Sequence, residues 1–259
     1  MPPAHARRTR ILDIVNAQGF ARVTELAQQM QVTEVTVRSD LTHLARSGAV
    51  RRVHGGAVPG RRSVADEAGY EASLLRAADE KERIGRVAVG LLSPGAAVMI
   101  DAGTTTTAMV RALVARDDLE GVVVITNSLT IALELEPTIP RHTVVISGGT
   151  LRPRQHSLVD PLGDAVIGRI RADVGVIGCN GVDVEAGITN SSMTEAAVKA
   201  RMLEASHRRV VLADSDKIGR VQLTQVAPLA GVDTLITTRQ APASVVADIE
   251  ACGIEVIKA

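Results

Sequence analysis

Six short apolar runs between residues 97 and 237 constrain the fold of this chain more than any other feature. They are AVMI (97–100), VVVIT (122–126), TVVIS (143–147), VGVIG (174–178), VVLA (210–213) and TLIT (234–237), with EVI (255–257) as a possible edge strand. The runs are rich in β-branched residues and do not alternate polar with apolar side chains. That composition is typical of parallel strands covered on both faces.

Segments compatible with helices separate these runs. Helices are expected near residues 79–92, 105–115, 129–135, 161–170, 194–205 and 243–251. Strands that alternate with helices predict a doubly wound α/β domain, which we place at residues 73–259. Apolar residues make up 46% of the chain, but its only aromatic residues are Phe20 and Tyr70, so Val, Ile, Leu and Ala must form the core.

Polar and glycine residues follow the predicted strands at the points where they end, and ligands of doubly wound domains bind there. After the first strand, Asp101 and Gly103 precede threonines at a helix start, whose free amides and hydroxyls suit a phosphate. Carboxylates and amides at other strand ends suit sugar hydroxyls, and Lys217 offers a cation. We predict a sugar-phosphate pocket formed by Asp101, Gly103, Thr104, Thr105, Thr106, Asn127, Ser128, Gly148, Gly149, Asn180, Asp183 and Lys217.

A simpler interpretation of the threonines is that they only cap a helix. Taken alone, the stretch Asp101–Thr107 leaves the two interpretations equally open. It is neither a GxxxxGK loop nor a GxGxxG fingerprint. The polar clusters at the other strand ends favour the pocket, because residues without a common role would be scattered.

A different pattern occupies residues 24–57. Thr33 can cap a helix in which Val37, Leu41 and Leu44 recur at helical spacing and mark the buried side. Gly48 would end this helix, and a basic ribbon with Gly55-Gly56 at its turn follows. We predict a winged helix-turn-helix over residues 1–58 that reads bases in a DNA major groove. The candidate DNA-binding residues are Thr36, Arg38, Ser39, Thr42, His43, Arg46, Arg51, Arg52 and His54.

Charge divides between the two predicted domains, although the whole chain has a net charge of zero. Residues 1–62 contain ten arginines and four acidic residues, which gives them a net charge of +6. A basic head on an acidic body is typical of a DNA-binding protein with a separate ligand domain. We place the linker at residues 59–72, where the composition turns polar, and expect Tyr70 to dock it onto the body.

The run ELAQQMQVTEVTVRSDLTHLARSGAVRRVHGGA resembles the N-terminal signature of DeoR-type bacterial transcriptional regulators. The family usually has two arginines before the helix Asp, whereas here Ser39 follows Arg38. The resemblance therefore implies the docking mode of the family but does not define the preferred operator sequence. The segments IDAGTTT, TNS, SGG, NGVD, EAAVK and ADSDKIG resemble the DeoR-type sensor domain. This resemblance implies a fold similar to ribose-5-phosphate isomerase and a phosphorylated sugar or related metabolite as effector.

An isomerase-like enzyme with a DNA-binding head is the alternative hypothesis. The isomerases carry a Gly-x-Asp-x-x-Asp pattern, and the matching stretch here begins at Gly178 and has Asn180 at its first Asp position. An amide is no general base at neutral pH, so we expect no catalysis. Glu195 and Lys199 are spaced as a helix ion pair, which we favour over ligand contacts or remnants of acid/base machinery.

The sequence therefore predicts a cytoplasmic, metabolite-controlled repressor of carbohydrate-metabolism genes. Its partners would be a double-stranded DNA operator, a phosphorylated sugar or related small molecule, and further copies of itself, because one head reads too few base pairs for specificity. No metal or cofactor site is predicted, since the six histidines are scattered and there are only two cysteines. Cys179 is expected to be a buried thiol at a strand end.

Overall fold

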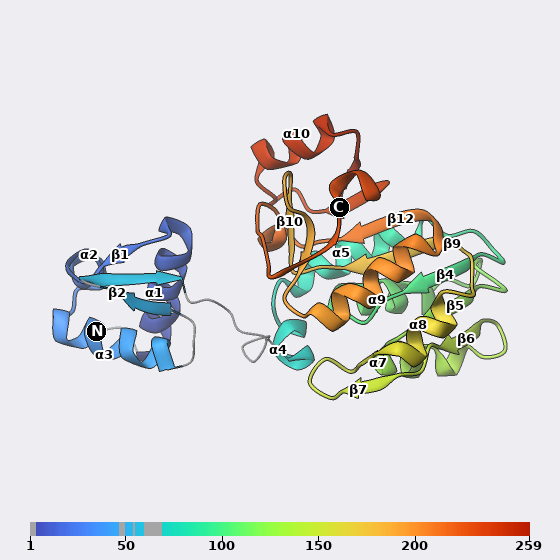
Figure 1. Ribbon diagram of the computed structural model, residues 1–259, viewed down its shortest axis with the longest axis horizontal. Helices are drawn as coiled ribbons and strands as arrows, with labels where there is room; N and C mark the ends of the chain where they lie inside the picture. The colour runs from blue at the N-terminus through green and yellow to red at the C-terminus, as the bar shows by residue number, and fades with distance from the viewer. Residues whose placement is uncertain (1–3, 47–49, 54, 60–68) are drawn as a thin grey trace. The chain divides into compact units, whose positions relative to one another are not determined.

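The computed structural model describes residues 4–46, 50–53, 55–59 and 69–259. The chain forms two compact units, Met1–Glu67 and Ala68–Ala259 (Figure 1). Among the described residues, no helix is long and apolar enough to cross a membrane.

The N-terminal unit is a three-helix domain with a small antiparallel sheet, as predicted. Its helices are α1 (Ala4–Gln18), α2 (Val23–Met30) and α3 (Glu34–Arg46). Its strands β1 (Ala21–Arg22), β2 (Val50–Val53) and β3 (Gly56–Pro59) pair in the order β1-β3-β2. The strand β1 has only two residues, since Phe20 lies outside it and Val23 already belongs to α2.

The core of this unit confirms the helical pattern of the sequence. Val37 and Leu41 of α3 are almost completely buried, and Leu44 is buried with them. They pack against Ile11 and Leu26 from the other two helices. Thr33 caps α3 as expected, because its hydroxyl oxygen accepts a hydrogen bond from the Thr36 amide at 3.3 Å. The opposite side of α3 is therefore left exposed.

The C-terminal unit is built on a parallel sheet of seven strands. Its strands are β4 (Ala97–Ile100), β5 (Val123–Thr126), β6 (Thr143–Ile146), β9 (Ala172–Gly178), β12 (Ser206–Leu212), β14 (Thr234–Thr237) and β15 (Glu255–Lys258). Their order is β15-β14-β12-β9-β4-β5-β6, so the predicted strand at 255–257 is an edge strand. Chain order reverses between β4 and β9, and this pair forms the topological switch point of the sheet.

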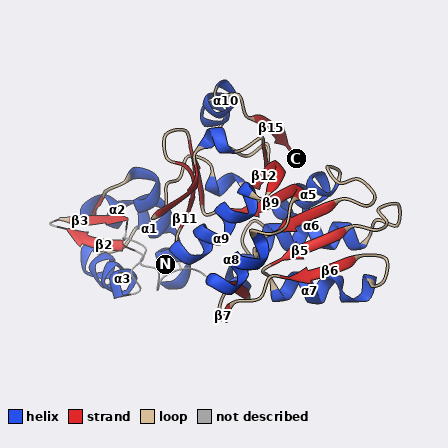
Figure 2. Cartoon of the chain, turned by 45° about the vertical axis from the view of Figure 1, so that its right-hand side comes forward, coloured by secondary structure: helices blue, strands red, loops and turns tan. Residues whose placement is uncertain are grey.

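Helices cover both faces of this sheet, which confirms the doubly wound α/β fold (Figure 2). One face packs against α5 (Ala78–Val89), α6 (Thr104–Val114) and α7 (Leu129–Leu135). The other face packs against α8 (Pro161–Ile167), α9 (Met193–Glu204) and α10 (Ala243–Ala251). Val98 and Ile100 of β4 belong to the first core and Met99 to the second, so consecutive side chains serve opposite faces.

Several short elements were not predicted. A hairpin pairs β7 (Thr150–Arg152) with β8 (Ser157–Val159), and a second sheet has the order β10-β11-β13, from β10 (Gly181–Asp183), β11 (Gly187–Asn190) and β13 (Thr224–Ala227). A one-turn helix, α4 (Tyr70–Leu74), begins inside the range expected to be linker. These strands have only three or four residues each, which is too short for a periodic apolar pattern to mark them.

Candidate functional site

The switch point between β4 and β9 carries a buried ion pair. The Asp101 carboxylate at the end of β4 accepts a hydrogen bond from the Gly178 amide at 2.9 Å and contacts the Lys199 ammonium. Lys199 also donates to the Gly178 carbonyl oxygen at 3.1 Å. Asp101 and Lys199 are 1% and 5% exposed, so this pair joins α9 to the strand ends. It lies at the position in the sheet where open α/β domains bind ligands.

The turn after β4 leads directly into α6, which begins at Thr104. Thr106 donates its hydroxyl to the carbonyl oxygens of Asp101 and Gly103 at 2.8 and 2.9 Å, so this hydroxyl stabilises the turn. Thr104 and Thr105 make no side-chain hydrogen bond within the described part of the chain. The first amides of a helix have no acceptor in a preceding turn. These two residues therefore offer both amides and hydroxyls to an anion.

Gly103 matters here for space rather than for backbone freedom. Its φ of 176° is extended backbone that any residue adopts. A Cβ at this position would lie 3.1 Å from the Thr106 hydroxyl oxygen, which is a tight contact. A larger residue would thus crowd the start of α6.

The next strand end holds the turn in place. Asn127, after β5, accepts a hydrogen bond from the Ala102 amide at 2.9 Å through Oδ1. Its Nδ2 donates to the Leu158 carbonyl oxygen of β8 at 3.0 Å. Ser128 caps α7, since its hydroxyl accepts from the Ile131 amide at 3.2 Å. Both predicted site residues therefore have structural contacts, and Asn127 links the turn to the β7–β8 hairpin.

Two ammonium groups and a carboxylate come together beyond β12. Lys217 ends the short 3-10 helix Ser215–Lys217, and it interacts electrostatically with Asp214 and with Lys81 of α5. Burial lowers the pKa of Lys81 to about 8, although the charge of Asp214 acts to raise it. Burial also raises the pKa of Asp214, whose Oδ1 has no hydrogen-bond partner among the described residues. Residue patterns predicted Lys217 but missed Lys81 and Asp214.

Glu80, next to Lys81, fixes the loop that carries Lys217. Its carboxylate accepts hydrogen bonds from the Ser215 amide and hydroxyl, both at 2.9 Å, and from the Thr238 hydroxyl at 2.6 Å. Burial acts to raise the pKa of Glu80, but the hydrogen bonds from Thr238 and Ser215 outweigh it and hold the pKa below its usual value. Glu80 is therefore a charged anchor for the loop.

Other residues that were predicted to line the sugar-phosphate pocket have structural roles that need no ligand. Asp183 closes the turn after β10, where its Oδ1 accepts from the amides of Glu185 and Ala186 at 3.0 and 2.9 Å. Asn180 accepts from the Ser191 amide at 3.0 Å and fixes the start of α9. Gly149 has a φ of 120°, and a Cβ there would collide with the Val159 carbonyl. Gly148, with a φ of 73°, belongs to the same turn.

Glu195 and Lys199 of α9 are bound to other elements. Glu195 forms an ion pair with Arg152 of β7 at 2.5 Å and accepts from the Ser157 hydroxyl at 2.9 Å. Lys199 contacts Asp101, as described above. The sequence predicted an ion pair between Glu195 and Lys199 within α9. The main partners of both residues instead come from strand ends that are distant in the sequence. Cys179 follows β9 as expected, but the residue is half-buried rather than buried, and its partial loss of solvation raises the pKa of the thiol to about 12.

The N-terminal unit presents a polar surface on α3. Arg38, Ser39 and His43 are exposed, and Thr36 and Thr42 are half-buried. Arg52 of β2 donates to the Thr42 hydroxyl at 3.0 Å and so connects the wing to α3, while Arg51 is exposed beside it. Arg46 is the last residue of α3, and its side chain, like all of His54, lies outside the described residues.

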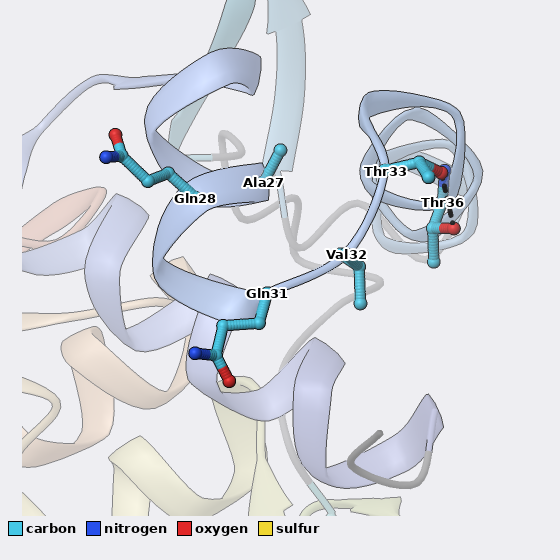
Figure 3. Close-up of a pocket in the computed structure, with 6 residues that line it drawn as sticks. All are labelled: Ala27, Gln28, Gln31, Val32, Thr33 and Thr36. Atoms are coloured by element: carbon cyan, nitrogen blue, oxygen red, sulfur yellow. Dashed lines mark hydrogen bonds between the residues drawn. The ribbon is translucent and has the colours of Figure 1, made fainter.

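A hollow of about 410 Å³ lies at the turn between α2 and α3 (Figure 3). It is lined by Ala27, Gln28, Gln31, Val32, Thr33 and Thr36. The turn depends on Gln31, which has a left-handed φ of 53° and directs the chain into α3. Amide and hydroxyl groups therefore lie next to the N-terminus of the exposed helix. Sequence reasoning named only Thr36 from this group as a contact residue.

A buried carboxylate holds the exposed helix to α1. Asp40 of α3 is 1% exposed and accepts from Arg7 at 2.6 Å and from Arg8 at 2.8 Å. Burial acts to raise the pKa of Asp40, but the two guanidinium groups outweigh this effect and hold it below its usual value. The orientation of α3 therefore depends on an ionised Asp40.

Comparison with known proteins identifies the class to which both units belong. Residues 7–60 match the DeoR-like helix-turn-helix domain, and residues 76–239 match the DeoR C terminal sensor domain. The HTH-type transcriptional regulator GlpR of Haloferax volcanii is 35% identical over 257 residues, covering 99% of this chain and 98% of that protein. The glycerol-3-phosphate regulon repressor of Escherichia coli is 28% identical over 239 residues, 92% of each chain. The chain belongs to the DeoR family of transcriptional regulators.

Membership of this family sets aside the enzyme hypothesis, because the family consists of DNA-binding regulators rather than enzymes. A solved structure of ribose 5-phosphate isomerase A from Methanocaldococcus jannaschii is similar over 54% of each chain, with 15% identity and a TM-score of 0.40.

Proposed function

We propose that this protein is a repressor of carbohydrate-metabolism genes that a phosphorylated sugar or related metabolite releases from its operator. The turn at Gly103–Thr105 carries the proposal, because its amides and two uncommitted hydroxyls lie at the topological switch point. Lys81 and Lys217 would supply positive charge to the phosphate. The name of the Escherichia coli relative, a glycerol-3-phosphate regulon repressor, supports this class of effector.

The head would bind DNA through α3 and the wing. Thr36, Arg38, Ser39, Thr42 and His43 would face the bases and Arg46, Arg51, Arg52 and His54 the backbone and groove edges. The hollow at the start of α3 would receive a phosphate next to helix amides. Two or more copies, acting in the cytoplasm where the DNA lies, would bring enough heads to an operator for specificity.

Replacing Arg51 and Arg52 with Ala should weaken binding to every DNA sequence. Each lost phosphate contact lowers the slope of log K against log salt by about 0.9, so the double variant should lose about 2 units of slope. Ser39→Ala should instead change which operator is preferred. Gel-shift titrations at several salt concentrations measure both effects. Arg239→Ala, an exposed arginine of the other unit, is the matched control, and an unchanged slope in the wing variant would remove the wing from the interface.

Effector affinity should fall as pH rises through the pKa of Lys81, which is about 8. An anion binds the protonated ammonium, so the affinity is complete below that pKa and falls about tenfold between pH 7 and pH 9. A sugar phosphate stays a dianion over this range because its second pKa is about 6. Calorimetric titration with D-ribose 5-phosphate or glycerol 3-phosphate measures the trend. The Lys81→Met variant should bind the effector more weakly, and its affinity should not change with pH in this range. If the affinities of both proteins fell equally with pH, Lys81 would be excluded as a contact of the effector.

A further inference from the structure

The one-turn helix α4 lies at the junction between the two units in the sequence. It begins at Tyr70 and is the first helix of the sensor unit, and residues 60–68 connect it to the reading head. A change in how α4 packs on the sensor unit would therefore change where the chain leaves this unit toward the DNA-binding domain. Two independent sets of contacts hold α4 in place, and each continues to the proposed effector site.

The first set joins α4 to the loop of the β7–β8 hairpin. The Tyr70 amide donates to the Arg154 carbonyl oxygen at 2.7 Å. The Tyr70 ring stacks on His156, with centroids 4.9 Å apart and planes inclined by 23°. Glu71 lies 3.2 Å from Nε2 of the same histidine. The predicted docking of Tyr70 onto the body is thus confirmed, and a histidine is its partner.

The hairpin in turn connects to the effector site through β8 and to α9 through β7. Asn127 donates to Leu158 of β8 and accepts from Ala102 in the phosphate-binding turn, so one side chain joins hairpin and turn. Arg152 of β7 pairs with the buried Glu195. His156 is fixed by Thr130 of α7, whose hydroxyl lies 2.9 Å from Nδ1. A displacement at the turn is therefore transmitted through Asn127 to the surface on which Tyr70 stacks.

The second set of contacts comes from Lys81. Its ammonium donates to the Ser73 carbonyl oxygen at 2.5 Å and to the Arg76 carbonyl oxygen at 2.6 Å, which fastens the end of α4. The same ammonium interacts electrostatically with Asp214 and Lys217. An anion bound beside Lys81 would compete with these two carbonyl oxygens, because a hydrogen bond between two charged groups is stronger than one to a neutral carbonyl.

We propose that α4 is the element that couples effector binding to the reading heads. Without effector it is docked by Tyr70 on His156 and by Lys81 on two carbonyl oxygens. An anionic effector draws Lys81 away from those oxygens and shifts α4 toward an undocked state, which changes how the heads are held and weakens operator binding. The inference rests on the proposed effector site, and the coupling is reciprocal, so operator binding favours docked α4.

Tyr70→Ala removes the stacking ring, and Tyr70→Phe is the matched control. The Tyr70 hydroxyl has no hydrogen-bond partner among the described residues, so phenylalanine retains the contacts that matter. Full-length proteins would be tested on an operator selected in vitro from random DNA. Fluorescence anisotropy gives operator affinity with and without saturating D-ribose 5-phosphate or glycerol 3-phosphate, and calorimetry gives the affinity for the same probe.

We expect the wild type and Tyr70→Phe to lose at least about fivefold in operator affinity when the probe binds, the lower end of typical coupling. Tyr70→Ala should bind the probe at least as tightly as the wild type. Its operator affinity, however, should change less than about twofold when the probe binds. Hydrogen exchange at residues 70–76 should accelerate when the probe binds the wild type. If the probe weakened operator binding by Tyr70→Ala as much as it does for the wild type, the proposed role of α4 would be overturned.

A ligand-free comparison separates this inference from the proposed effector. Loss of the Tyr70–His156 stack alone should imitate the effector-bound state. Without probe, Tyr70→Ala should therefore bind the operator at least about threefold more weakly than Tyr70→Phe. The reason is that loosely held heads have a lower effective concentration at the operator. If no probe binds the wild type, the proposed effector class fails, and this difference still tests α4. Equal operator affinities in the two variants would overturn the inference by themselves.

Discussion

Thr105→Glu is expected to abolish effector binding while leaving operator binding intact. Thr105 is the second residue of α6 and is 8% exposed, so a carboxylate at this position would occupy the turn where the phosphate of the effector should bind. Repulsion between two anions in a poorly solvated site should cost at least about 3 kcal/mol, which is more than a hundredfold in affinity. The variant should behave as a repressor that does not respond to inducer.

Thr105→Gln separates charge from size in this test. Glutamine has nearly the same volume as glutamate, so it should weaken the effector far less if the charge is responsible. Calorimetric titration with the sugar phosphate and operator binding would be measured for all three proteins. If the threonine only supports the helix end, both variants should lose stability but keep the ligand response. Equal effector affinity in Thr105→Glu and wild type would contradict the phosphate site.

Asp40→Ala should unfold the reading head or leave it marginally stable. Removing one partner of a buried ion pair leaves uncompensated charge and costs about 3–5 kcal/mol. Here both Arg7 and Arg8 lose their carboxylate, and a small domain has only about 5–15 kcal/mol of stability in total. Operator binding should be lost, while the sensor unit should still bind its effector. Hydrogen exchange of α1 and α3 in the full-length protein measures the effect directly.

Arg38→Ala provides the control for stability in the same helix. Arg38 pairs with Glu34 one turn away at 3.2 Å, and both side chains are about half exposed. Such a pair contributes only about 0.3–0.5 kcal/mol, so this variant should exchange like the wild type. If the amides of α1 and α3 in Asp40→Ala were as protected from hydrogen exchange as those of the wild type, the buried ion pair would not be what holds α3.

The head should also lose stability in acid. The folded-state pKa of Asp40 lies below its usual value, so the contribution of its ion pairs is complete above about pH 4, the unfolded-state pKa. It disappears as the pH falls through the lower folded-state value. Asp40→Asn, which cannot ionise, should therefore show a flatter acid unfolding curve.

The fold could be predicted where one residue pattern repeats over a whole element. The β-branched runs at 97–100 and 122–126 predicted strands covered on both faces, and the two cores confirm this. The hairpin of β7 and β8 could not be found in this way. Its strands have three residues each, and they are held by Asn127 and Glu195, which are distant in the sequence.

The candidate sites also contain some residues that a sequence pattern could predict and others that only the tertiary structure reveals. The exposed side of α3 followed from helical spacing, because every third or fourth residue had to be buried. Lys81 could not be found, since it lies in the charged run Asp79–Arg83, which resembles a solvated helix face. Only the tertiary structure buries it, because Ser73 of α4 and Arg76 just after this helix both accept hydrogen bonds from its ammonium. Asp183 and Gly149 are the opposite case, because their polar or glycine character serves turns and packing.

One binding experiment tests the central claim most directly. Operator affinity of the full-length protein would be measured by fluorescence anisotropy against a panel of sugar phosphates, each beside its unphosphorylated sugar. We predict that at least one phosphorylated compound weakens operator binding about tenfold or more, a typical coupling strength, and that the matching free sugar has no effect. If the protein binds its operator specifically and no phosphorylated compound weakens that binding, the account of a phosphate-controlled repressor is contradicted.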